Sequence, residues 1–369
     1  MKTIRFAQWS CLLAALGGLS GRAFADGVSL SGMIDSGVTY VSNENGHSTA
    51  FLDSGIAAPD TFSIRGQEAL GGDWRALFNL TSQFNVGNGT TVPSAGEVFN
   101  RTALVGLASD RYGSFTAGTQ YDFMTDSLTV KGFDDAFTYG GLYDFRQGPF
   151  ARLDIPGNPT GSFDFDRMGG TERVTDSVKY QSPSFDGLSA GGLYGFGGTP
   201  GSVSADSTTS FGLNYGYDAF ALGLAYVDVK YPEFDDGHEG IRTWGAGLRY
   251  RFRRVRTTLL FTRTQNTESG AAVDVYKMGA SGNLGGPWSG ALDYTYMKGN
   301  EAVGGAAANQ FTATLSYALS PRTKLYAEAI YQRTNSDDAG AWINGLPAAD
   351  SQSSSRNQVL SRIGLLTSF

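Results

Sequence analysis

Cysteine is nearly absent from this 369-residue chain, since Cys11 is the only one. It lies in a short apolar segment, 11–19, that follows Lys2 and Arg5 and precedes Ala23-Phe24-Ala25. A basic start, an apolar core and an A-x-A site in that order predict a secretory signal peptide over residues 1–25. The mature chain, 26–369, would then have no thiol, which excludes disulfides as a source of stability.

Long apolar runs and histidines are also scarce. No run of 18 apolar residues occurs, which excludes a transmembrane helix. His47 and His238 both fall in predicted polar connections, which does not favour a Ser-His-Asp site. We therefore expect no enzyme and no cofactor, with an outer-membrane phospholipase as the alternative. Loss of Lys2, Arg5 and Arg22 takes the net charge from −7 to −10, which argues against nucleic acid as a partner.

The chain instead has side chains that alternate with a period of two. Residues 243–252 place aromatic and aliphatic side chains on one face and Thr, Gly and Arg on the other. Neighbouring side chains of a strand point to opposite faces, so one face suits hydrocarbon and the other suits water. The same alternation occurs in 74–83, 288–296, 310–317 and 358–369. This pattern predicts a transmembrane β-barrel, with a soluble β-sandwich or jelly roll as the alternative.

The connections between these segments alternate in length. Short turns are predicted at 70–72, 110–113, 183–187, 217–219, 252–254, 285–287 and 320–322. Longer polar stretches are predicted at 43–60, 86–96, 198–206, 231–240, 300–308 and 335–356. Short periplasmic turns and long external loops are typical of outer-membrane barrels. We expect about 16 antiparallel strands in one domain, 26–369, with a water-filled channel. The last strand, ending at Phe369, is expected to close the ring.

Residues 122–172 interrupt the alternation. The segment is far longer than a typical connection and contains nine acidic and four basic residues. Its aromatic residues, among them Phe123, Phe133 and Tyr143, argue against disorder. We expect it to fold inward as a constriction loop, with a surface lid as the alternative.

Four motifs resemble the betaproteobacterial branch of the Gram-negative general diffusion porins. They are the first strand at 27–40, Ile64 to Gly72, Phe99 to Leu107, and Tyr112 to Tyr121. The resemblance implies a 16-stranded barrel with an inward third loop, a homotrimer in outer-membrane lipid and lipopolysaccharide, and passive diffusion of ions and small hydrophilic solutes. It also implies that the last strand, with Phe369, is the signal read by the outer-membrane assembly machinery. One departure is Thr61, which stands where the family commonly has arginine.

Charged side chains are the candidates for the constriction, because charges that line a pore set its selectivity. Strand parity places Arg65, Arg75, Lys179, Arg249, Arg251 and Arg362 on polar faces, with the acids Asp35, Asp293 and Glu328. Parity does not place Arg101 inside, but the family motif implies a wall position. The loop contributes Asp122, Asp126, Asp134, Asp135 and Asp144, with Lys131 and Arg146 among them. The acidic loop favours a weak preference for cations, and the alternative for each residue is a solvated side chain without a special role.

The acidic stretch 235–239 is a weaker candidate. Asp235, Asp236 and Glu239 offer hard oxygen ligands for a divalent cation, but they lack the spacing of a calcium loop. A solvated acidic loop is the alternative. The sequence as a whole predicts an outer-membrane porin. A substrate-specific channel, or an adhesin-like barrel whose external loops bind a ligand, is the second hypothesis.

Overall fold

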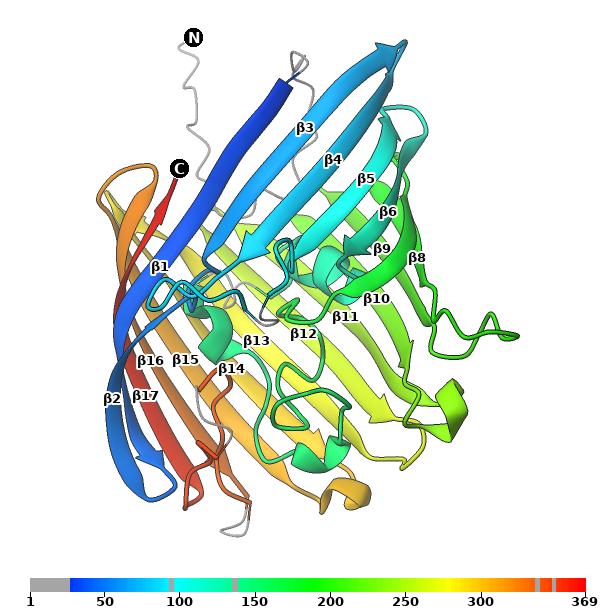
Figure 1. The fold of residues 1–369 in the computed structure, drawn as a ribbon. Helices are drawn as coiled ribbons and strands as arrows, with labels where there is room; N and C mark the ends of the chain where they lie inside the picture. Colours follow the sequence, from blue (N-terminus) through cyan, green and yellow to red (C-terminus); the bar gives the residue numbers. More distant parts are fainter. Residues whose placement is uncertain (1–26, 93–95, 135–138, 336–338, 347–349) are drawn as a thin grey trace.

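The computed structural model of the chain describes residues 27–92, 96–134, 139–335, 339–346 and 350–369. The expected signal peptide, 1–25, and Asp135 lie outside the described residues. Strands make up most of the described part, and they follow one another around a ring (Figure 1). Among the described helical turns, none has the length or the apolar character that crossing a bilayer requires.

The strand segments form one antiparallel sheet that closes on itself. Their bounds are β1 Gly27–Glu44, β2 His47–Ser54, β3 Thr61–Gly71, β4 Trp74–Gln83, β5 Thr102–Ser109, β6 Gly113–Gln120, β7 Val174–Gln181, β8 Leu188–Gly195, β9 Thr208–Tyr217, β10 Phe220–Lys230, β11 Gly240–Phe252, β12 Val255–Asn266, β13 Ala272–Gly285, β14 Trp288–Gly299, β15 Ala307–Ala318, β16 Thr323–Thr334 and β17 Asn357–Ser368. The ring closes between β1 and β17, where Gly32 and Phe369 donate backbone hydrogen bonds to each other at 3.2 and 3.1 Å. Closure removes the two free edges that an open sheet would have.

Two of the segments share one partner. β1 pairs with β3 along Gly27–Met33 and with β2 along Ser36–Glu44, so β2 and β3 form one barrel strand interrupted at 55–60. Pro59 has no N–H to donate. At the break, the Asp35 carboxylate accepts hydrogen bonds from the N–H groups of Ile56 and Ala57 at 2.8 and 3.0 Å. The sheet is therefore a closed 16-stranded barrel, as predicted.

The stretch 43–60 differs from its prediction as a long connection. Residues 47–54 of this stretch form strand β2, which follows β1 after a tight turn at Asn45-Gly46, where both residues have positive φ. Asn and Gly are the residues that enter such a turn at least cost. The turns predicted at 70–72, 110–113, 183–187, 217–219, 252–254, 285–287 and 320–322 each join two adjacent strands. The longer connections lie at the opposite end of the barrel.

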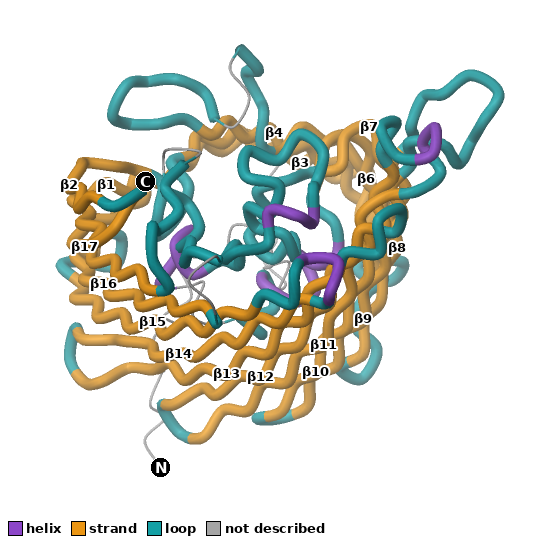
Figure 2. The backbone as a smooth tube through the Cα atoms, turned by 90° about the horizontal axis from the view of Figure 1, so that it is seen from below, coloured by secondary structure: helices purple, strands orange, loops and turns teal. Residues whose placement is uncertain are grey.

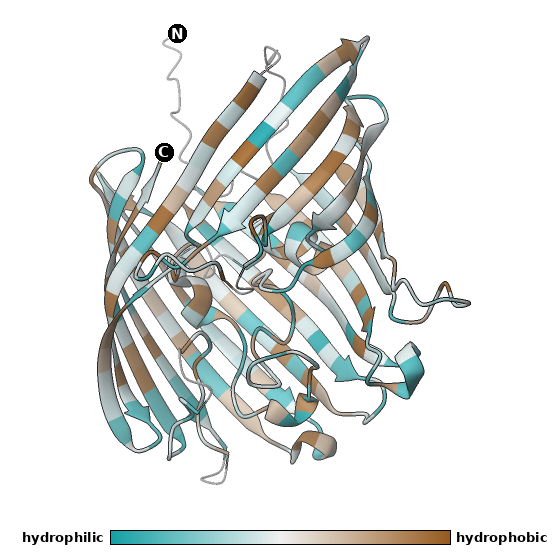
Figure 3. Cartoon of the chain, viewed as in Figure 1, coloured by the Kyte–Doolittle hydropathy of each residue, from teal (hydrophilic) through white to brown (hydrophobic). Residues whose placement is uncertain are grey.

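Hydrophilic and hydrophobic residues alternate along the strands (Figure 3), and the exposure of their side chains confirms the predicted faces. On β11, Trp244, Leu248 and Tyr250 are exposed on the outer face, while Thr243 is buried on the inner face. On β17, Ile363 is 69% exposed and Arg362 is 1% exposed. Apolar side chains therefore line the outer wall and polar side chains line the inner wall, as a barrel in lipid requires.

Candidate functional site

The connection between β6 and β7 lies within the ring of strands when the barrel is seen along its axis (Figure 2). Its first helical turn, Met124–Thr129, contacts β9, β10 and β11. Phe123, Met124, Leu128 and Phe133 are buried there against the wall. Glycines make room for the rings, because a Cβ on Gly223 or Gly247 would lie 2.5 and 2.6 Å from atoms of Phe133.

The middle of this connection is joined to the wall by a buried charge cluster. Lys277 of β13 lies 2.9 Å from Asp134 and 3.6 Å from Asp293, and it also forms a salt bridge with Asp144. Arg146 forms salt bridges with Asp134 at 2.6 Å and Asp166 at 2.9 Å. Burial raises the pKa of Asp134, but Lys277 and Arg146 outweigh it and hold that pKa at about 2.

Further ion pairs join both ends of the connection. Arg167 lies 2.6 Å from Asp122, within the connection, and Lys179 of β7 forms a salt bridge with Asp126. Arg362 of β17 lies 3.2 Å from Asp35 and also pairs with Asp53. The Tyr143 hydroxyl donates to Asp53, which connects this group to the loop. The structure thus places Asp122, Asp126, Asp134, Asp144 and Arg146 in direct contact with counter-charges.

Other predicted residues lie outside these ion pairs. Arg249 donates to the backbone carbonyl of Lys131 and lies 5.4 Å from the centre of the Phe133 ring, while Lys131 itself is exposed. Arg75 and Arg251 each lie one residue from the turn end of their strand, away from the connection. Arg75 pairs there with Asp110 at 2.9 Å. The prediction of Arg75 and Arg251 as constriction residues is therefore not supported by their positions, because parity gives the face of a residue but not its height.

Three arginines gather where the connection leaves and rejoins the wall, and we call them the arginine cluster: Arg65, Arg101 and Arg173. The guanidinium carbons of Arg101 and Arg173 lie 5.5 and 5.6 Å from the centre of the Tyr121 ring. Both arginines donate to the side-chain oxygen of Gln83, Arg173 at 3.0 Å. Arg65 donates to Asn79 at 3.2 Å. Within the described residues, none of the three forms a salt bridge with a carboxylate.

The position of Arg101 decides between two opposite predictions of where its side chain points. Its parity with the exposed Val105 predicted an outward side chain, whereas the family motif implied the inner wall. Arg101 precedes β5 by one residue, so strand alternation does not fix its direction, and its side chain reaches the inward-facing Gln83. Burial lowers the pKa of Arg101 to about 10, and the nearby Arg173 contributes to the decrease.

Sequence reasoning missed Lys277, Arg167, Arg173, Asp164 and Asp166. Lys277 shares its inward face with Val273 and Val275, which are fully buried. These valines obscure the alternation of β13, because they pack against Phe150 and Leu153 of the connection rather than facing water. Arg173 directly precedes β7. It lies near Arg101 because the connection returns to the wall at this point.

The candidate cation ligands do not converge. Among the described residues, no three His, Cys, Asp or Glu side chains form a group that could hold a metal ion, so Asp235, Asp236 and Glu239 do not form one. The N–H groups of Gly237 and Glu239 instead donate to the carbonyl of Phe234 at 3.0 and 3.3 Å, which closes the turn through the backbone. His47 and His238 are both exposed.

Comparison with known proteins agrees with this architecture. The chain is 27% identical to an outer membrane porin protein of Bordetella pertussis over 381 aligned positions, which cover 87% of this chain and 94% of that protein. The fold is similar to an anion-selective porin from Comamonas acidovorans, with a TM-score of 0.76, 21% identity, and 94% and 100% of the two chains covered. It is also similar to OmpF of Salmonella typhi, with a TM-score of 0.64, 16% identity, and 93% and 98% covered.

The model of the Gram-negative porin family matches residues 12–339. The match spans most of the chain, and the closed barrel has the architecture expected for such a protein. The chain therefore belongs to the Gram-negative porins, and it is an outer-membrane channel for diffusion.

Proposed function

We propose that the channel passes small hydrophilic solutes and ions with a preference for anions. The observation that carries this proposal is the arginine cluster, whose three guanidinium groups have amide and carbonyl partners but no carboxylate partner in the part of the chain that the structure describes. Five acids of the loop, by contrast, form salt bridges with Lys277, Arg146, Arg167 or Lys179; they are Asp122, Asp126, Asp134, Asp144 and Asp166. Unpaired charge beside a water path attracts the opposite ion.

This proposal reverses the weak cation preference that the acidic loop favours in the sequence. The loop carries an excess of acids, but a carboxylate buried against a lysine contributes little field at a distance. The structurally similar Comamonas protein is an anion-selective porin, which supports the same direction. We also propose that residues 122–172 narrow the channel, since their described contacts are with inward-facing wall residues.

Several further features are proposed from the family. They are removal of residues 1–25 as a signal peptide, residence in lipid and lipopolysaccharide as a homotrimer, recognition of Phe369 by the assembly machinery, and the absence of catalysis. Phe369 is 56% exposed on the outer face, where a receptor can reach the ring before insertion. The pairing of Phe369 with Gly32 supports a role for the last residue in closing the ring.

The test is the reversal potential of the purified channel in a planar bilayer under a KCl gradient. We expect the sign of anion preference for the unmodified chain, and a shift toward cations for the double variant Arg101→Gln, Arg173→Gln. The control is Arg75→Gln, which removes one positive charge from the turn end of β4 and should shift the potential least. A cation-selective unmodified channel, or equal shifts in the double variant and the control, contradicts the proposal.

A further inference from the structure

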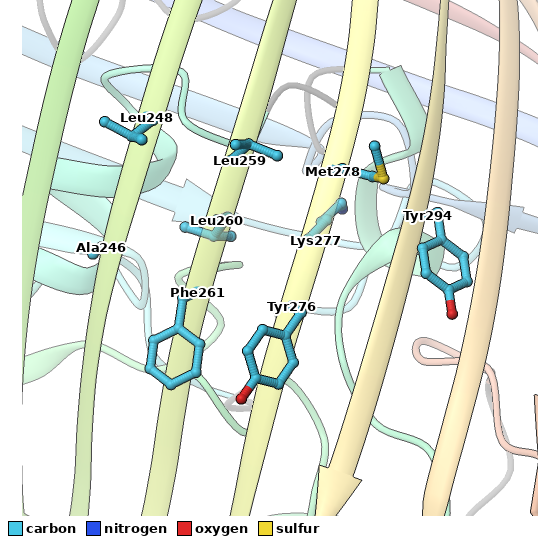
Figure 4. A pocket seen from close by; sticks show the side chains of 9 residues that line it. All are labelled: Ala246, Leu248, Leu259, Leu260, Phe261, Tyr276, Lys277, Met278 and Tyr294. Atoms are coloured by element: carbon cyan, nitrogen blue, oxygen red, sulfur yellow. The ribbon is translucent and has the colours of Figure 1, made fainter.

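An apolar groove runs along the outer face of β11–β14 (Figure 4). Its volume is about 440 Å³, and the outward-facing side chains that line it are Ala246, Leu248, Leu259, Phe261, Tyr276, Met278 and Tyr294. Leu259 and Met278 are 55% and 56% exposed, so the groove opens toward the membrane. It is recessed because Ala246 provides only a methyl group beside these larger side chains.

Beyond the residues that line the groove, the outer face has small side chains toward the end of the barrel that carries the short turns. In register, Thr257 of β12 lies beside Ala280 of β13, and Val255 lies beside Gly282. Thr257 and Ala280 are both exposed, and Gly282 has no side chain. Tyr250 and Leu292 flank this strip of small residues on β11 and β14. A narrow apolar path therefore leads from the groove to the turn between β11 and β12.

That turn is strongly basic. The eight residues from Arg249 to Arg256 include five arginines and no acid. Arg249, Arg251 and Arg256 belong to the inward face, whereas Arg253 and Arg254 form the exposed tip. Among the described residues, neither Arg253 nor Arg254 forms a salt bridge with a carboxylate.

The backbone conformation of the turn is unfavourable for the arginine at position 253. Arg253 has φ +55°, in the left-handed region that Gly, Asn and Asp enter at lower cost. The corresponding position of the turn between β9 and β10 is Asp218, with φ +51°. An arginine in this strained conformation is a reason to look for function.

We propose that the groove and the turn bind one anionic glycerophospholipid of the periplasmic leaflet, with an acyl chain in the groove and the phosphate at Arg253 and Arg254. Short turns mark the periplasmic side of such barrels. Leu259 and Val255 are four residues apart, about 13 Å along a strand. This span fits within the roughly 15 Å of hydrocarbon in one leaflet. Charge complementarity selects an anionic headgroup, because basic residues at a membrane surface attract anionic lipids.

The site is tested with the whole chain in detergent by native mass spectrometry, titrated with phosphatidylglycerol or phosphatidylcholine. We expect the unmodified chain to bind phosphatidylglycerol more tightly than phosphatidylcholine, and more weakly as salt is raised. The double variant Arg253→Gln, Arg254→Gln should bind phosphatidylglycerol roughly tenfold more weakly. Ala280→Trp, which blocks the path, should also weaken binding.

Two controls separate the site from general effects. Arg322→Gln removes an exposed arginine from the turn between β15 and β16, and Ala327→Trp adds the same ring on the outer face of β16. Both should bind phosphatidylglycerol as the unmodified chain does. Equal binding of the two lipids, or binding in either site variant that matches its control, overturns the proposal.

Discussion

Two parts of the inner wall follow the same alternation and differ in what covers them. On β12–β17, the connection between β6 and β7 lies against the wall, and polar side chains such as Thr262, Gln310 and Gln332 are fully buried. On β3 and β4, Arg65 and Asn79 are only partly buried. On the covered wall Lys277 and Arg362 are paired with carboxylates, while the buried Glu328 has no hydrogen-bond partner among the described residues. On the open wall Arg65 has no carboxylate partner among the described residues. The difference shows that an inward charge anchors the loop in one place and faces the water path in another.

The energetic consequences differ as well. A charge removed from water needs a partner, and loss of that partner leaves a buried charge uncompensated. A charge that stays in contact with water is stabilised by the solvent, and its exposed ion pairs contribute little to stability. Mutations on the covered wall should therefore change stability, while those on the open wall should change selectivity.

The largest effect is expected for Lys277→Met on the covered wall. Lys277 is the counter-charge of Asp134, Asp144 and Asp293, and its side chain is 3% exposed. Removing one partner of a buried pair costs about 3–5 kcal/mol. Urea unfolding in detergent, followed by Trp fluorescence, should show this loss. Lys298→Met, at an exposed outer position of β14, is the control and should leave the midpoint nearly unchanged.

A pH-dependent contribution is expected from Asp164 of the connection. Burial, together with the charge of Asp166, raises the pKa of Asp164 to about 7, although Thr171, Gly169 and Arg146 oppose the shift. The folded chain thus binds this proton more tightly than the unfolded chain. The contribution to stability is fully present below pH about 4 and is lost as pH rises to about 7.

Asp164→Asn should remove this component, which is on the order of a few kcal/mol at about 1.4 kcal/mol per pKa unit. Asn also tolerates the positive φ of this position. The measurement is the midpoint of urea-induced unfolding at pH values of about 4, 5.5 and 7. Asp154→Asn, at an exposed position of the same segment, should retain the pH dependence of the unmodified chain. Parallel pH curves for Asp164→Asn and the unmodified chain would contradict the assignment.

A smaller effect on stability is expected for Arg65→Gln on the open wall. It removes the hydrogen bond to Asn79, which contributes about 1 kcal/mol. It also removes one charge of the arginine cluster, so the reversal potential should move toward cations. A stability loss as large as that of Lys277→Met, with no change in reversal potential, would mean that the two walls do not differ as described.

The smallest effect is expected for Arg75→Gln. This residue pairs with Asp110, whose side chain is 72% exposed, and such surface pairs contribute about 0–1 kcal/mol. Both the unfolding midpoint and the reversal potential should stay close to those of the unmodified chain. A marked change in either would place Arg75 in a role that its position at the turn end of β4 does not explain.

Much of the barrel could be predicted because its signals are local. Alternation assigned the faces of β11, β14, β15 and β17, and Gly, Pro and Asp marked the short turns. The interruption between β2 and β3 could not be predicted in this way. Asp35 maintains it through hydrogen bonds to Ile56 and Ala57, more than twenty residues away.

The candidate site was predicted in composition but not in arrangement. The sequence indicated an acidic segment opposite basic wall residues, and Asp134, Asp144 and Arg146 do belong to the charge cluster. Lys277 was not identified, because the apolar Val273 and Val275 share its face. Arg173 was not identified either, since its relation to Arg101 depends on a connection of about fifty residues returning to the same part of the wall.

The sequence by itself determined the closed barrel, its outward apolar face and its polar interior, because side-chain alternation acts residue by residue along each strand. Only the tertiary structure decided which inward charges are neutralised and which remain unpaired. The position of the connection between β6 and β7 on the inner wall depends on contacts between residues far apart in the chain. The electrostatic field depends on distances between charges, which no local sequence pattern encodes.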